Sequence, residues 1–220
     1  MDVIRIRYGR WLAGAVSAVL AGVSSLTVAT PARAAIVELT SGHVDVIDVN
    51  HTAGGPIVVS VRDDTGSVPV ERDPATVVFK VPPAAYSAVP SGPAWSFLGS
   101  GGHAYVLPQA NTSGLLWAGW NTTQVASGAL QNNRVVFRLT HVQGPGGFSV
   151  YTASGGTPTV LFDSGDGLPD SLNVNRNAHA HVNWGFDVAG TYLVTFQVSG
   201  VRAADGQAVS TTKQFTFQVG

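Results

Sequence analysis

Two histidines separated by a single residue are the part of the sequence best suited to chemistry. His179 and His181 fall in a stretch of alternating polar and apolar residues. In an extended strand their side chains would point to the same face, about 7 Å apart, which is close enough for two imidazoles to reach one metal ion. Asn183 would share that face. Val182 and Trp184 would lie on the other face and anchor the strand in a core.

A second polar pair offers the further ligands that a metal site needs. His43 and Asp45 share one face of an otherwise apolar predicted strand. Because the chain contains no cysteine, the ligands would be nitrogen and oxygen atoms, a set that suits zinc, manganese or copper. We therefore expect a divalent metal site formed by His43, Asp45, His179 and His181. The alternative is that these histidines lie on the surface or are held by hydrogen bonds, without a metal.

The remaining histidines and one acidic loop are weaker candidates. His51 and His103 are further options as ligands, whereas His141 lies on an apolar strand face and is expected to be a hydrogen-bonded core histidine. The loop from Asp163 to Asp170 places glycine and leucine where a calcium loop needs oxygen ligands, so we expect a polar turn there.

The sequence shows no recognisable catalytic motif. It contains no G-x-S-x-G nucleophile elbow, no H-E-x-x-H helix and no phosphate-binding glycine loop. No pair of carboxylates flanks an aromatic cleft. We therefore expect a protein that is not an enzyme.

The middle of the chain is rich in aromatic residues and shows neither a helical nor a strand period. This texture predicts a loop-rich insertion whose aromatic side chains either fill a core or line a ligand pocket. Trp95, Trp117 and Trp120 would suit a carbohydrate-binding module if their rings were exposed and roughly coplanar. Trp120 and Asn183 are the candidate ligand-binding residues.

Strand-like segments separated by turn residues make up most of the remaining sequence. Of its 220 residues, 45% are hydrophobic and only 11% are charged, and it contains 26 glycines and 12 prolines. Residues 134–142, 192–198 and 210–219 are typical of strands. We expect an all-β fold, namely an antiparallel immunoglobulin-like β-sandwich with the loop-rich aromatic insertion, formed by a single domain over residues 36–220.

The first 34 residues have the pattern of a signal peptide. Three arginines within the first ten residues precede a run of small apolar residues, and A-R-A at residues 32–34 forms a cleavage site before Ala35. This predicts a secreted protein with no membrane span after cleavage. The formal net charge of −1 gives no electrostatic support for binding nucleic acid.

A series of short motifs, each occurring once, extends over nearly all of the chain beyond residue 41. In order, they are G-H-V-D-V at 42–46, F-L-G at 97–99, L-P-Q at 107–109, G-W-N-T at 119–122, G-P-G-G-F at 144–148, L-F-D-S at 161–164 and H-x-H-x-N-W-x-F-x-x-x-G-x-Y at 179–192. Together they resemble the actinobacterial surface-anchored repeat domain, also called the choice-of-anchor M domain. The last motif is the most specific of the series.

The resemblance implies a binding module at the cell surface. Members of that family occur as wall-anchored repeats or fused to substrate-binding proteins of metal-uptake ABC transporters. The implied partners are therefore an ABC transporter substrate-binding protein or a cell-wall component, and the implied location is extracellular and cell-wall associated. The expected function is a secreted, non-catalytic cell-surface module that binds zinc or manganese and is linked to ABC-type metal uptake. A wall-associated structural module without metal and a carbohydrate-binding module are the alternatives.

Overall fold

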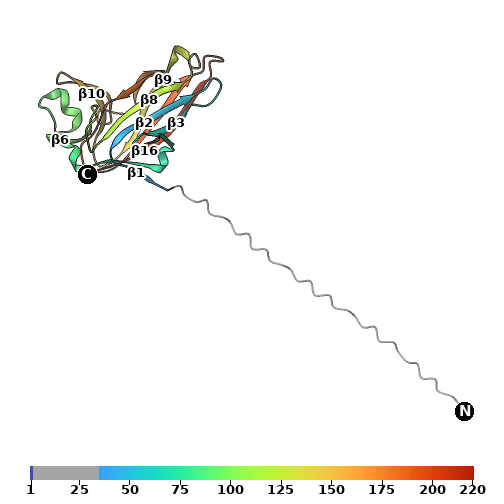
Figure 1. Cartoon of the computed structure of the whole chain (residues 1–220), viewed down its shortest axis with the longest axis horizontal. Coiled ribbons are helices and arrows are strands. Elements are labelled where there is room, and N and C mark those ends of the chain that lie inside the picture. Colours follow the sequence, from blue (N-terminus) through green and yellow to red (C-terminus); the bar gives the residue numbers. More distant parts are fainter. Residues whose placement is uncertain (2–34) are drawn as a thin grey trace. The chain divides into compact units, whose positions relative to one another are not determined.

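Strands arranged in three sheets form most of the structure, a computed structural model that describes Met1 and residues 35–220 (Figure 1). The expectation of an all-β sandwich fold is therefore confirmed. The predicted signal peptide falls outside the described residues apart from Met1. No helix within the described residues is long and apolar enough to cross a membrane.

The sheets hold sixteen strands among the described residues. The six-stranded sheet has the order β1 (Val37–Leu39), β5 (Val77–Val81), β16 (Ala208–Val219), β15 (Gly190–Val201), β9 (Arg134–Gln143) and β12 (Asp170–Asn175). One five-stranded sheet has the order β11 (Thr157–Asp163), β10 (Phe148–Ser154), β14 (Asn183–Phe186), β7 (His103–Leu107) and β6 (Tyr86–Ala88). The other has the order β13 (His179–His181), β8 (Leu116–Val125), β2 (Gly42–His51), β3 (Val58–Asp63) and β4 (Val70–Arg72).

Short 3-10 helices occupy several of the connections. They are η1 (Pro74–Thr76), η2 (Pro83–Ala85), η3 (Pro93–Leu98) and η4 (Gln131–Asn133). Most strand pairings are antiparallel, as expected. Within the described residues three pairings are parallel: β1 with β5, β5 with β16, and β2 with β8.

A large core joins residues of all three sheets, and a smaller second cluster contains Trp95, Leu98, Ala104 and Tyr151. The long hairpin of β15 and β16 alternates as the sequence predicts, so that Phe196 and Phe217 point inward and are almost fully buried. Trp184 of β14 packs against both rings, at centroid distances of 6.4 and 5.8 Å. The predicted apolar face of the strand after the histidines is therefore correct, since Val182, Trp184 and Phe186 are all buried.

The aromatic section is not simply a loop-rich insertion. It contains η3, β7 and β8, and β8 pairs with β13 on one side and with β2 on the other. Figure 1 shows β8 beside β2. The strand pattern of β8 is hidden because residues on both of its faces are covered: Leu116, Trp120 and Thr122 are buried, and so are the intervening Gly119 and Asn121. A strand buried on both sides shows no polar–apolar alternation.

Candidate metal centre

The predicted metal ligands come from two strands that flank β8. His43 and Asp45 lie on β2, and His179 and His181 lie on β13. Neighbouring strands in a sheet are about 4.8 Å apart, so these two strands are separated by about 10 Å across β8. Imidazole side chains that lean over the middle strand span such a gap only where that strand carries no bulky residue.

Gly119 of β8 supplies the necessary space. It is the register partner of Asp45 on one side and of His181 on the other. A Cβ atom at position 119 would lie 2.4 Å from the carbonyl oxygen of Ala180 and 2.8 Å from Nδ1 of His181. A glycine therefore lets β13 approach closely and leaves room for the ligand side chains above β8.

The four ligand atoms converge on one point. Nε2 of His43 lies 3.0 Å from Nε2 of His181 and 3.2 Å from Nε2 of His179. Oδ1 of Asp45 lies 2.9 Å from Nε2 of His179 and 3.8 Å from Nε2 of His43. All four ligand atoms are within 4.8 Å of one another, and this group could hold a metal ion.

These separations are near those around a tetrahedral ion. Zinc bonds of about 2.0–2.1 Å in tetrahedral geometry place the ligand atoms about 3.3–3.4 Å apart. Four of the six separations lie on both sides of that value, between 2.9 and 3.8 Å, and the other two are within 4.8 Å. Oδ2 of Asp45 is buried and has no hydrogen-bond partner. An unpaired carboxylate oxygen in this position indicates a site that gains from a cation.

An outer carboxylate orients the first histidine. Nδ1 of His43 lies 3.0 Å from Oδ2 of Asp64, which also accepts a bond from Nε of Arg62 at 3.2 Å. A neutral His43 that donates its Nδ1 proton to Asp64 turns the lone pair of Nε2 toward the other imidazoles. Carboxylates commonly fix metal-binding histidines in this way.

Burial shapes the protonation of the cluster. Burial, reinforced by the charges of His43 and His179, lowers the pKa of His181 to about 4. Burial also raises the pKa of Asp45, and its attraction to His179 and His43 offsets this only in part. His181 is thus neutral at pH 7, the form of imidazole that coordinates a metal.

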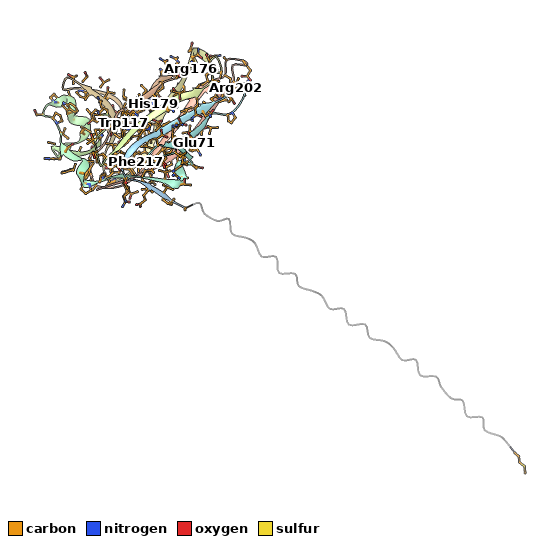
Figure 2. All side chains as sticks on the ribbon, viewed as in Figure 1. Glu71, Trp117, Arg176, His179, Arg202 and Phe217 are labelled. Carbon is orange, nitrogen blue, oxygen red and sulfur yellow. The ribbon has the colours of Figure 1, made fainter. Side chains whose placement is uncertain are left out.

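Trp117 holds one of the imidazoles in place. Its ring stacks on that of His181 at a centroid distance of 3.8 Å and an interplanar angle of 17°, and its indole nitrogen donates to the carbonyl oxygen of Gln109 at 2.8 Å. Trp117 and His179 lie in the same part of the domain (Figure 2). The stack and the hydrogen bond restrict the orientation of the His181 ring.

A polar cleft leads to the cluster from solvent. It has a volume of about 520 Å³ and is lined by His43, Asp45 and His179 together with charged and amide side chains. The side chain of His179 is 42% exposed, whereas that of Asp45 is 1% exposed. A metal ion therefore has a route of entry past His179.

Asn183 does not share the histidine face, contrary to the prediction. The chain leaves one sheet after His181 and enters another at Asn183, where β14 pairs with β7 and β10. Asn183 is buried, accepts a bond from the backbone nitrogen of Gln109 at 2.9 Å and donates to the carbonyl oxygen of Tyr151 at 3.2 Å. These hydrogen bonds join β14 to β10 and to the loop at Gln109, so the amide oxygen and nitrogen of Asn183 already have partners.

Trp120 is also not placed for ligand binding. It is 6% exposed and packs edge-to-face against Phe137 in the main core. Trp95 is 8% exposed, and the partly buried Trp117 is stacked on His181. The three rings do not form the exposed platform that the carbohydrate-binding hypothesis requires, so that version of the hypothesis is wrong.

The other histidines lie outside the cluster. His51 is buried, with Nδ1 3.1 Å from the carbonyl oxygen of Pro56, and His103 is exposed and stacks on Tyr86. His141 is exposed rather than buried in the core. The register between β9 and β15 shifts next to it, and the resulting bulge reverses the alternation of β9 after Leu139.

The acidic loop forms the expected polar turn. Asp163 accepts a bond from the backbone nitrogen of Gly165 at 2.8 Å, and Asp170 accepts one from the backbone nitrogen of Asp163 at 2.7 Å. Both carboxylates thus satisfy backbone groups of their own turn.

Three contributors to the metal centre were not expected from the sequence. Nothing local links Asp64 to His43, because their contact depends on the pairing of β2 with β3. Gly119 had a usable signal, since a glycine inside a strand often marks a close approach by another backbone. Trp117 was expected only as an aromatic residue of the insertion or of a carbohydrate-binding surface.

Comparison of the chain with protein-family models, curated proteins and solved structures gave no match. The interpretation of the centre therefore depends on its geometry.

Proposed function

We propose that the chain is a secreted, non-catalytic binding module that takes up one divalent transition metal ion, with zinc preferred, through His43, Asp45, His179 and His181. The observation that carries this proposal is the convergence of three Nε2 atoms, with His43 3.0 and 3.2 Å from the other two. A proton on one of these nitrogens bridges only one pair of imidazoles at a time, whereas a cation between the three nitrogens accepts a lone pair from each.

The ligand set favours zinc over manganese. Three imidazoles and one carboxylate match the nitrogen-rich sets that zinc binds, whereas manganese prefers carboxylate, carbonyl and water oxygens. Four protein ligands complete a tetrahedral shell and leave no position for an activated water molecule. The arrangement therefore favours binding of the metal over hydrolytic chemistry.

The sequence motifs suggest a cellular setting for this module. The signal-peptide pattern and the resemblance to the actinobacterial surface-anchored repeat domain support an extracellular, wall-associated protein that delivers metal to an ABC transporter substrate-binding protein. The open cleft at His179 suits such exchange. N-terminal sequencing of the secreted protein tests the setting: we expect the first residue to be Ala35, whereas a chain retained inside the cell with residue 1 intact would contradict secretion.

Metal analysis tests the binding function. The purified protein, loaded with zinc and desalted, should carry one zinc ion per chain. The double variant His179→Ala/His181→Ala should carry none, and His103→Ala, an exposed histidine outside the cluster, should retain one. Equal zinc content in the double variant and the parent would overturn the proposal.

A further inference from the structure

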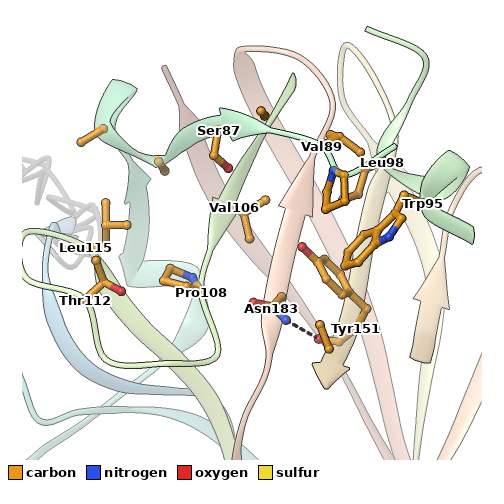
Figure 3. A pocket seen from close by; sticks show the side chains of 15 residues that line it. Ser87, Val89, Trp95, Leu98, Val106, Pro108, Thr112, Leu115, Tyr151 and Asn183 are labelled. Carbon is orange, nitrogen blue, oxygen red and sulfur yellow. Dashed lines mark hydrogen bonds between the residues drawn. The ribbon is translucent and has the colours of Figure 1, made fainter. Parts of the chain in front are cut away.

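A second, chemically different cavity lies apart from the metal centre. It has a volume of about 380 Å³ and shares no lining residue with the histidine cluster. Figure 3 shows Trp95, Leu98 and Tyr151 on one side, Pro108, Thr112 and Leu115 on the other, and the chain near Ser87 and Val89 above. Its volume falls in the range of small-molecule pockets.

The walls of the cavity are apolar and uncharged. They are formed mainly by alanine, valine, leucine, proline and aromatic residues, and none of the lining residues carries a charge. A charged ligand would lose its hydration there without gaining an opposite charge, so the cavity selects neutral molecules.

One hydroxyl that faces the cavity is free to bond to a ligand. Tyr151 is 5% exposed, and its hydroxyl points into the space between the walls (Figure 3). No residue in the described part of the chain accepts or donates a hydrogen bond to this hydroxyl, and burial alone raises the pKa of the phenol to about 12. Tyr151 therefore remains a protonated donor at neutral pH.

Two of the other polar side chains that line the cavity already have partners, and the third, Ser87, is exposed. The amide of Asn183 bonds to Gln109 and to the carbonyl oxygen of Tyr151, and the hydroxyl of Thr112 donates to the carbonyl oxygen of Ala110 at 3.1 Å. The phenol of Tyr151 is thus the donor left inside the cavity to recognise a ligand. An acceptor on the ligand would bond to this hydroxyl once the ligand has displaced water from the cavity.

We propose that this cavity binds a small, neutral, mainly apolar molecule whose single carbonyl or ether oxygen accepts a hydrogen bond from the Tyr151 hydroxyl. The edge-to-face arrangement of Trp95 and Tyr151, with ring centroids 5.9 Å apart, provides an aromatic wall for a ring or a short alkyl group. The inference is independent of metal binding.

Two matched probes test the hydrogen bond. Acetophenone carries a carbonyl oxygen, and ethylbenzene has nearly the same shape without an acceptor. Titration of the full chain, followed by the NMR signals of the Trp95 indole, should give a Kd for acetophenone below about 1 mM. Ethylbenzene should bind about two- to tenfold more weakly, the range expected for one net hydrogen bond.

Variants separate the cavity from non-specific binding. Tyr151→Phe should reduce acetophenone binding to the level of ethylbenzene, whereas Tyr86→Phe, an exposed tyrosine outside the cavity, should leave it unchanged. Val106→Phe, which fills the middle of the cavity, should abolish binding of both probes. No saturable shift at millimolar probe, or equal affinity of Tyr151→Phe and the parent for acetophenone, would overturn the proposal.

Discussion

Nε2 of His43 lies 3.0 Å from Nε2 of His181, although 138 residues separate them in the chain. The contact crosses β8, the strand between β13 and β2, at the position where β8 has Gly119. Sheet register, rather than any local motif, therefore assembles the candidate metal centre.

Replacing the glycine should disrupt the centre. In Gly119→Ala the new Cβ atom would clash with the carbonyl oxygen of Ala180 and with the ring of His181, so β13 must shift. We expect zinc affinity to fall by about tenfold or more, equivalent to about 1.4 kcal/mol, because the shift of β13 moves His181 away from the other ligands. Isothermal titration calorimetry measures this change. Gly66→Ala, where a Cβ atom meets nothing within 4 Å, is the matched control, and unchanged affinity in Gly119→Ala would refute the role of the glycine.

Loss of the outer carboxylate should weaken metal binding without removing a ligand. Asp64→Asn removes the charge that orients His43 through Nδ1, and we expect about a tenfold loss of zinc affinity. Glu71→Gln removes the other carboxylate that faces Arg62, at 3.6 Å, and does not touch His43. If a competition assay with a fluorescent chelator gave equal losses for the two variants, Asp64 would act only through the general field of the cleft.

A buried acid near the centre should make the metal-free protein less stable at high pH. Burial, together with the charges of Glu71 and Asp45, raises the pKa of Asp48 to about 7. The folded state therefore binds the proton more tightly than the unfolded state, and its stability falls as the pH rises from about 4 through 7.

Asp48→Asn should remove this dependence. At pH 8 in EDTA the variant should be more stable than the parent by about 1–3 kcal/mol in urea unfolding, and the difference should vanish near pH 4. Asp63→Asn is the control of opposite sign. Burial would raise the pKa of Asp63, but hydrogen bonds from Thr65 and Arg72 outweigh burial and hold this pKa below its ordinary value. The charged form of Asp63 therefore stabilises the folded state, and Asp63→Asn should lower stability at pH 8. A parent more stable than Asp48→Asn at pH 8 would contradict this account.

The aromatic stack should influence how firmly the metal is held. Trp117→Leu removes the ring that lies 3.8 Å from His181 and leaves all four ligands in place. We expect zinc to dissociate several-fold faster, since the imidazole regains rotamer freedom at a cost of about 0.5–1.5 kcal/mol on rebinding. Stopped-flow transfer of zinc to EDTA measures the rate. Trp95→Leu, far from the ligands, should leave it unaltered; a matching increase there would point to general loosening of the fold.

The sequence predicts correctly which face a side chain occupies where this depends on the alternation within one strand. The spacing of His179 and His181 places both imidazoles on one face, and the alternation of β15 and β16 is visible directly in residues 192–198 and 210–219. The partnership with His43 and Asp45 was expected only as a supply of suitable ligands. The parallel pairing of β2 with β8 is what brings them to the right place.

The errors arose where the local period is broken by tertiary structure. Asn183 continues the alternation after His181, but the chain changes sheets there, so its side chain faces a different layer. A bulge in β9 turns His141 outward. Strand β8 shows no strand pattern in the sequence because both of its faces are covered. Asp64 contacts His43 through the pairing of β2 with β3, which no local pattern predicts.

X-ray absorption at the zinc K-edge tests the central claim most directly. We expect the zinc-loaded protein to show one zinc ion with four nitrogen or oxygen neighbours at about 2.0–2.1 Å and the outer-shell scattering of three imidazoles. In His179→Ala/His181→Ala that imidazole signal should disappear. A zinc ion with six oxygen neighbours, or with fewer than two imidazoles in the parent protein, would contradict a centre built from His43, Asp45, His179 and His181.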